Sequence, residues 1–336
     1  MILHGELKMT EISMTRSSYT KFALLILSFM SLVPSPIHGL HSQSTSTSMS
    51  RTNLQHQAVR VRAILQQRNA DMNGSTSTSI YAPPPSKELY FPSSYKQKYG
   101  SRGFCNWLIP NHVMIGQYPG MTPEKHGPTE EEAQLHVHKM VNDARIRAFY
   151  CLQSEVPSQD DYKSWNGNVN AVHVDGNGNG KVQLPIDGGR RDFPGYFTHY
   201  APLVELALDM DLDLDVEAAK GPRVSYNHAP ILDLNTPSSS SLFSLLSTIL
   251  TNLECENSNS ALYIHCWGGR GRAGLVGSCL LSLLFPELDA EECLEWVQRG
   301  YDTRDGAMFM PLGLRQSPQT WSQRVFVHQF VSDFRR

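Results

Sequence analysis

Acidic residues are missing from a long stretch near the N-terminus of this 336-residue chain. No Asp or Glu occurs between Ser13 and Ala70, although the whole chain carries 29 basic and 32 acidic side chains. Seven of the basic and three of the acidic residues lie among residues 1–80, so residues 81–336 carry a net charge of −7. A body this acidic disfavours general binding of nucleic acid or of an anionic membrane surface. Any anion that the chain binds must therefore be held in a local pocket.

The N-terminal region also lacks an apolar run long enough to span a bilayer. Phe22 to Val33 contains twelve apolar or small residues, follows Lys21 and is ended by Pro34. At about 1.5 Å per residue this run falls short of a hydrocarbon core of roughly 30 Å, but it suits the apolar region of a signal peptide. A buried core helix is the alternative. We therefore assign residues 1–40 to a signal-peptide-like segment and expect no stable membrane span after processing.

Residues 41–89 are rich in Ser, Thr, Gln and Arg, and we predict a disordered presequence and linker there. Within them, Ala58 to Gln67 could form one or two amphipathic turns. A signal peptide followed by an acid-free segment resembles the two-part presequence that reaches complex plastids in some algae. We expect entry into the secretory route, with plastid delivery, secretion or a signal anchor left open. The folded domain is expected to begin near Tyr90.

The six cysteines form no Cys-x-x-Cys pair, which excludes the common zinc and dithiol patterns. Their number is also too low for a disulfide-stapled miniprotein of this length. We expect most of them to be small core residues. Asp175 to Val182 imitates the start of a calcium-binding loop, but Ile186 stands where the bidentate Glu is required. We predict no metal site and no cofactor.

Helical and strand patterns alternate along residues 90–336. A Thr129–Glu132 capping box begins a helix, and residues 146–152 read as a strand. Leucines at helical spacing predict a helix over 239–253, and the apolar segment 261–265 predicts a further strand. Strands interleaved with helices indicate an α/β fold with a mainly parallel central sheet flanked by helices. The irregular interval 153–222 is interpreted as an insertion in this catalytic domain, at the rim of the sheet.

The segment 263–275, YIHCWGGRGRAGL, carries the clearest chemical signal. A predicted strand leads to Cys266, a glycine-rich loop follows, Arg272 comes six residues after the cysteine, and a helix begins at once. Such a loop can point its backbone N–H groups inward and, with the positive end of the helix, cradle a tetrahedral oxyanion. We expect a thiol in this cradle to ionise readily and to act as a nucleophile. The planar guanidinium of Arg272 can hold two phosphoryl oxygens.

HCWGGRGRAG resembles the His-Cys-x5-Arg signature of the cysteine-dependent protein tyrosine phosphatases, in their compact dual-specificity branch. The upstream segment APILDLNTPS resembles the loop that carries this branch's general acid, which puts Asp233 in register, 33 residues before Cys266. FCNWLIPNHVMIGQYPG and SPQTWSQRVFVHQF resemble the opening and closing segments of the family. The resemblance covers roughly Asn106 to Phe334, apart from the interval 153–222.

The resemblance implies a role for each matched residue. Cys266 would attack the phosphoryl group, and Asp233 would protonate the leaving oxygen and then activate the hydrolytic water. Asp has an ordinary pKa of about 3.9, so this role requires an environment that raises it. His265 would orient the loop through hydrogen bonds. The phosphate would be bound by the loop residues Trp267, Gly268, Gly269, Arg270, Gly271 and Arg272.

Two residues depart from or add to the family pattern. Ala273 stands where most members have Ser or Thr, whose hydroxyl stabilises the thiolate as it leaves, so we expect a slower second step. Arg270 adds positive charge at the mouth of the pocket, which would suit a multiply phosphorylated or acidic substrate. A solvated loop charge is the alternative reading of Arg270.

The sequence therefore predicts a phosphatase that hydrolyses phosphate monoesters through a phosphocysteine. The leading substrates are phosphotyrosine, phosphoserine and phosphothreonine in proteins. The same chemistry on a phosphoinositide or phosphoglucan is an alternative, and a catalytically silent phosphate-binding module is another. The joint presence of Cys266, Arg272 and Asp233 argues against the silent module. We expect a monomer whose partner is a phosphorylated protein or another phosphate monoester, with no nucleic acid.

Overall fold

The computed structural model describes the chain in the segments 50–73, 84–97, 100–124, 126–165, 169–170, 181–183, 190–192, 196–209, 224–255, 260–310 and 315–335. The signal-peptide-like segment 1–40 lies wholly outside these ranges. The calcium-loop-like residues 175–186 lie outside them apart from 181–183. Among the described residues, no helix combines the length and the apolar character that a membrane span requires.

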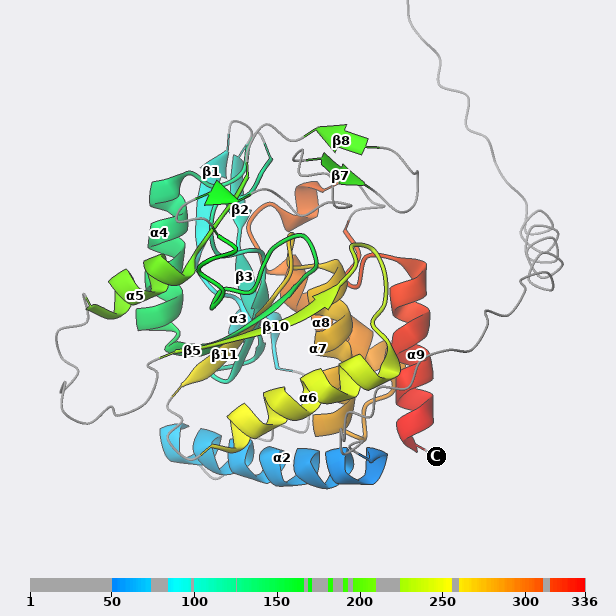
Figure 1. Cartoon of the computed structure of the whole chain (residues 1–336). Helices are drawn as coiled ribbons and strands as arrows, with labels where there is room; N and C mark the ends of the chain where they lie inside the picture. Colours follow the sequence, from blue (N-terminus) through cyan, green and yellow to red (C-terminus); the bar gives the residue numbers. More distant parts are fainter. Residues whose placement is uncertain are drawn as a thin grey trace, which may run out of the picture. The chain divides into compact units, whose positions relative to one another are not determined.

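A five-stranded sheet forms the centre of the described part, in the order β10-β5-β11-β4-β3 (Figure 1). The strands are β10 (Ser225–Ile231), β5 (Ile146–Gln153), β11 (Ala261–His265), β4 (Val113–Gly116) and β3 (Cys105–Ile109). The neighbours β10/β5, β5/β11 and β11/β4 run parallel, and β3 pairs antiparallel with β4. The predicted mainly parallel α/β sheet is confirmed. β11 is buried along its whole length, as an apolar strand covered on both faces must be.

Helices flank the sheet on both sides (Figure 1). One side carries α4 (Glu130–His138), a π-helical turn over Lys139–Asp143, and α5 (Ala201–Asp209). The other side carries α6 (Ser239–Glu254), α7 (Gly271–Leu284), α8 (Ala290–Asp302) and α9 (Trp321–Arg335). The predicted capping box at α4 is confirmed, and a second one forms at α8 through Asp289 and Glu292. Every residue of α7 is buried, so the helix that follows the glycine-rich loop is fixed in the core.

Shorter elements surround this frame. They are α3 (Ser86–Leu89), the hairpin of β1 (Ser94–Gln97) and β2 (Gly100–Gly103), the pair β6 (Val169–Asn170) and β9 (Phe197–Thr198), the pair β7 (Lys181–Gln183) and β8 (Arg190–Asp192), and a 3-10 turn over Ala307–Phe309. Parts of the interval 153–222 are core rather than rim, because Trp165, Phe197 and Tyr200 are fully buried.

Helix α2 (Arg51–Asn73) corrects the expectation of a disordered presequence and linker over 41–89 and of a domain that begins near Tyr90. Four apolar side chains at helical spacing are almost completely buried: Leu54, Ala58, Val61 and Leu65. The helix packs on α6 and α7. Burial of this apolar face favours a continuous helix over the one or two amphipathic turns predicted for Ala58 to Gln67.

The arginines of α2 bind the body of the domain. Arg60 pairs with Glu254 at 2.7 Å, and Arg62 pairs with Glu287, also at 2.7 Å. Arg68 donates to the backbone carbonyls of Leu253 and Cys255 at the end of α6. The arginines of α2 are therefore matched by acidic side chains and backbone carbonyls on the body of the domain.

Candidate active site

The candidate site lies where three neighbouring parallel strands end. β11 leads to Cys266, β10 leads to the loop of Asp233, and β5 leads to Glu155. The carboxyl ends of parallel strands share one edge of a sheet, so residues far apart in sequence meet there. The structure thus brings together the predicted residues Cys266, Arg272 and Asp233, with Cys266 only 3% exposed.

The backbone of the loop from Cys266 to Gly271 turns its carbonyl groups outward. The carbonyl of Trp267 accepts from the N–H of Tyr118, and that of Arg270 accepts from the hydroxyl of Ser317. A planar trans peptide points its N–H away from its carbonyl, so the next N–H groups in the loop face the opposite side. The N–H groups of Gly268 and Gly271 therefore face away from these two contacts, which is the orientation that an anion cradle would use.

Gly269 is required by this turn. Its φ angle is +63°, and a Cβ at this position would lie 2.0 Å from the backbone carbon of Gly116. Its carbonyl accepts a hydrogen bond of 3.0 Å from the Arg304 guanidinium. A side chain at Gly269 would therefore displace the loop from strand β4.

Arg272 is clamped by two carboxylates. Its NH1 and NH2 groups donate to the two oxygens of Glu155 at 2.6 and 2.9 Å, and NH2 also lies 3.1 Å from Asp233 Oδ1. Burial alone would lower the pKa of Arg272, but Glu155 and the other nearby negative groups raise it. The guanidinium is therefore held charged and in a fixed plane although it is 1% exposed. Its Nε is buried and has no hydrogen-bond partner among the described residues.

Asp233 has the electrostatic setting that a general acid needs. Burial raises the pKa of its carboxyl group, and the negative charge of Glu155 adds to this rise. The positive charge of Arg272 opposes the shift without cancelling it. Arg272 also donates to the carbonyl of Ile231 at 3.0 Å, so the guanidinium joins the loop of Asp233 to the loop of Cys266.

His265 is neutral and buried beneath the loop. Burial lowers its pKa to about 3, and its Nε2 lies 2.9 Å from the hydroxyl of Tyr200. Its ring packs edge-on against Tyr118 and stacks on Tyr263. These contacts fix the ring, which agrees with a role in orienting the loop rather than in transferring protons.

Comparison with known proteins adds a family to this geometry. Residues 203–321 match the family model described as "Swiss Army Knife protein, DSP-PTPase phosphatase domain". The match contains Asp233, Cys266 and Arg272. The segment 203–321 is therefore similar to the DSP-PTPase family.

The chain is also similar to individual proteins. The chain is 29% identical over 104 residues to cyclin-dependent kinase inhibitor 3 of Rattus norvegicus, and the alignment covers 31% of this chain and 42% of that relative. It therefore spans less than half of that relative's length. Two crystal structures match the chain at low identity. Kinase associated phosphatase has a TM-score of 0.40 at 14% identity, over 72% of this chain and 97% of that chain. A protein tyrosine phosphatase of Trypanosoma brucei has 0.38 at 15%, over 84% and 93%.

The remaining predicted residues of the loop after Cys266 differ in what they offer a ligand. The indole of Trp267 donates to Glu124 at 2.6 Å and packs edge-on against Phe197, so its side chain braces the loop. Gly268 has open space around it. Arg270 is half-buried, and Ala273 is completely buried at the start of α7.

Sequence reasoning missed three residues that hold the site. Glu155 clamps Arg272, Tyr200 contacts His265, and Arg304 binds the carbonyl of Gly269. Glu155 had a usable signal, because it is a carboxylate just beyond a predicted strand that neighbours the strand of Cys266. Tyr200 and Arg304 had none, since their contacts depend on the tertiary fold.

Proposed function

We propose that the chain is a cysteine-dependent phosphatase that hydrolyses phosphate monoesters through a phosphocysteine. The observation that carries this proposal is the state of Arg272. Two of its nitrogens are held by Glu155, while its buried Nε has no hydrogen-bond partner in the described part of the chain. A buried unpartnered donor is unfavourable in isolation, and a phosphoryl oxygen would satisfy it.

In the first step, the Cys266 thiolate attacks phosphorus and forms the P–S bond. The bond from phosphorus to the ester oxygen breaks, and Asp233 donates its proton to that oxygen so that the alcohol or phenol leaves neutral. The raised pKa of Asp233 supports the protonated form that this step needs. Arg272 and the loop N–H groups stabilise the equatorial oxygens as charge spreads over them.

In the second step, water attacks the phosphocysteine. Asp233, now ionised, accepts a proton from the water, the P–S bond breaks, and the thiolate of Cys266 returns with release of inorganic phosphate. Ala273 offers no hydroxyl to stabilise that thiolate, so this step should be the slower one.

We further propose that the substrate is a phosphorylated residue of a protein. Two large apolar side chains near the acid loop, which is the loop of Asp233, support this choice. Leu232 is 65% exposed and Trp321 is 80% exposed. Thr320, which precedes Trp321, donates to the carbonyl of Leu234, so both side chains belong to neighbouring segments of one rim. Exposed apolar groups around a polar pocket suit contact with a peptide chain.

Hydrolysis of p-nitrophenyl phosphate by the full chain tests the chemistry. Cys266→Ser should abolish turnover while vanadate binding largely survives, because the N–H cradle stays intact. Cys255→Ser is the matched control, since Cys255 is exposed at the end of α6, and it should keep full activity. Turnover by Cys266→Ser would remove this thiol from the mechanism. Phosphopeptides, phosphoinositides and phosphoglucan then test the substrate class, and faster hydrolysis of a lipid or glucan would overturn the proposed protein substrate.

A further inference from the structure

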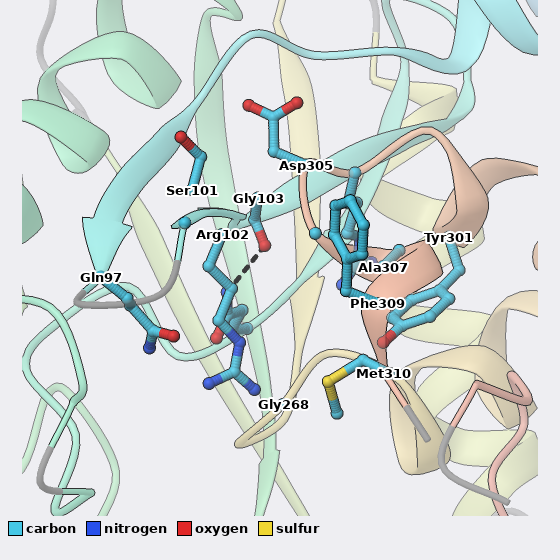
Figure 2. Close-up of a pocket in the computed structure, with 14 residues that line it drawn as sticks. Gln97, Ser101, Arg102, Gly103, Gly268, Tyr301, Asp305, Ala307, Phe309 and Met310 are labelled. Carbon is cyan, nitrogen blue, oxygen red and sulfur yellow. Dashed lines mark hydrogen bonds between the residues drawn. The ribbon is translucent and has the colours of Figure 1, made fainter. Parts of the chain in front are cut away.

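A cavity of about 300 Å³ adjoins the phosphate-binding loop (Figure 2). It lies between the β1–β2 hairpin and the turn that follows α8, and it reaches the loop at Gly268. The turn is pressed against the hairpin, because Gly103 N–H donates to the carbonyl of Asp305 at 2.7 Å. A Cβ on Gly306, whose φ is +78°, would lie 2.6 Å from the carbonyl oxygen of Ser101. The cavity is therefore a fixed feature of the packing between these two segments.

The two walls of the cavity differ in chemistry. The hairpin wall is polar, and Figure 2 shows the Arg102 guanidinium inside the cavity beside Gly268. The opposite wall carries Tyr301, Met310 and Phe309, which is 91% exposed. The cavity also contains one carboxylate, that of Asp305, which lies at the far end from the Arg102 guanidinium in Figure 2. Positive charge is thus concentrated at the end that meets the phosphate-binding loop.

Arg270 links the cavity to the catalytic site. Burial lowers its pKa, and the repulsion from Arg102 lowers it further. Tyr301 of the cavity and Cys266 and Asp233 of the catalytic site act on the same guanidinium in the opposite direction. Arg270 stands in the loop of Cys266, two residues after Gly268, which lines the cavity. The like charge of Arg102 acts on its guanidinium, and an anion bound in the cavity would offset this repulsion.

Arg304 adds a third positive charge under the cavity. Its guanidinium is buried and donates to uncharged acceptors, namely Asn106 Oδ1 and the carbonyls of Ile115 and Gly269. Within the described part of the chain, these donors reach neutral groups only. A buried cation with neutral partners keeps its field, so the floor of the cavity is positive. This local field contrasts with the net charge of −7 over residues 81–336.

We propose that this cavity binds a second anionic group of the substrate, a phosphate or carboxylate on a residue that flanks the phosphoresidue. Arg102 contacts that group, Arg270 lies between it and the scissile phosphate, and Tyr301 and Phe309 pack against the apolar part of the flanking side chain. The inference rests on the proposed function, since it names the substrate class that the same site selects.

The test compares phosphotyrosine peptides that are identical except for one flanking residue, which is Ala, Glu or phosphoserine on either side. For the full chain we expect kcat/KM to rise about tenfold from Ala to phosphoserine, as one charge-assisted hydrogen bond contributes about that factor. The peptide with Glu should show a smaller rise in kcat/KM if a carboxylate can occupy the cavity. Comparing Glu with phosphoserine therefore separates carboxylate from phosphate as the bound group. The preference should weaken as salt is added.

Arg102→Gln should bring the ratio of kcat/KM between the phosphoserine and Ala peptides close to one, and Arg102→Lys should keep most of it. Lys96→Gln is the matched control, because it removes one positive charge from the same hairpin at an exposed position outside the cavity. An unchanged ratio in Arg102→Gln, or no preference in the unmodified chain, would overturn the proposal. Turnover of p-nitrophenyl phosphate reports the chemistry separately, because it has no flanking group. If turnover is absent, the same peptides can carry a fluorescent label, and their binding to Cys266→Ser still measures the preference.

Discussion

Replacing Glu155 with Gln tests whether a buried ion pair holds Arg272 in the orientation that phosphate binding needs. The two side chains are 1% and 6% exposed, and their two hydrogen bonds measure 2.6 and 2.9 Å. Gln keeps one acceptor oxygen but places an amide N–H against a guanidinium N–H. Removing one partner of a buried pair costs about 3–5 kcal/mol, and the remaining contact of Arg272 with Asp233 at 3.1 Å favours the lower end.

A loss of about 3 kcal/mol should lower the melting temperature by about 6–12 °C in a domain of this size. We expect kcat/KM to fall by about 10- to 100-fold, because a displaced guanidinium no longer meets the phosphoryl oxygens. The pH profile should change as well. Glu155 raises the pKa of Asp233, so its removal lowers that pKa and depletes the acid form at a lower pH. The basic limb of the kcat profile should therefore move to lower pH for substrates with poor leaving groups.

Differential scanning calorimetry and pH-rate profiles measure these effects. Glu254→Gln is the control, since it breaks the exposed pair with Arg60 and should change neither stability nor rate appreciably. A Glu155→Gln protein that melts and titrates like the unmodified chain would show that the clamp does not position Arg272, and the structural argument for the site would fail.

Four further outcomes are expected. Asp233→Asn should slow alkyl phosphates much more than aryl phosphates with acidic leaving groups, as measured by their kcat values. Ala273→Ser should raise the steady rate after a burst, by roughly tenfold or more, because a hydroxyl then stabilises the departing thiolate; stopped-flow mixing measures both phases. Removal of residues 1–48 should leave the melting temperature unchanged, whereas removal of 1–73 should lower it by exposing the face beneath α2. His265 has a pKa of about 3 when folded and about 6.5 when unfolded, so urea unfolding should show stability falling as pH drops below about 6.5.

The elements that the sequence predicted well are those with strong local signals. The capping box at Thr129 and the apolar strand 261–265 need no distant partner to be recognised, and both appear as expected. The Cys-x5-Arg loop is likewise local, because its glycines, its cysteine and its arginine lie within seven consecutive residues. Such signals depend on backbone geometry and short-range hydrogen bonds, which the sequence carries directly.

The elements that were missed depend on distant contacts. Helix α2 has few apolar residues, and its arginines bind partners on α6 and beyond α7 that are distant in sequence. The polar composition alone therefore predicts a presequence. The spacing of Trp321, Val325, Phe330 and Phe334 predicts an inner face for the last helix, but Trp321 is 80% exposed. Gln323 is buried in its place, since its amide oxygen accepts from the N–H groups of Gln319 and Thr320 and its amide nitrogen donates to the carbonyl of Asn235. A polar residue that satisfies backbone groups of two loops overrides the apolar pattern.

Contacts that hold the acid loop (the loop of Asp233) and the phosphate-binding loop (the loop from Cys266 to Gly271) explain why the site acts as one unit. The acid loop is held from one side by Arg272, through the carbonyl of Ile231, and from the other by Gln323, through the carbonyl of Asn235. The phosphate-binding loop is held by Arg304 at Gly269 and by Ser317 at Arg270. Because Ser317 and Gln323 belong to the same segment before and within α9, that segment braces both loops at once. The position of Asp233 relative to Cys266 is therefore set partly by Arg304, Ser317 and Gln323, through hydrogen bonds to the two loops rather than to the thiol.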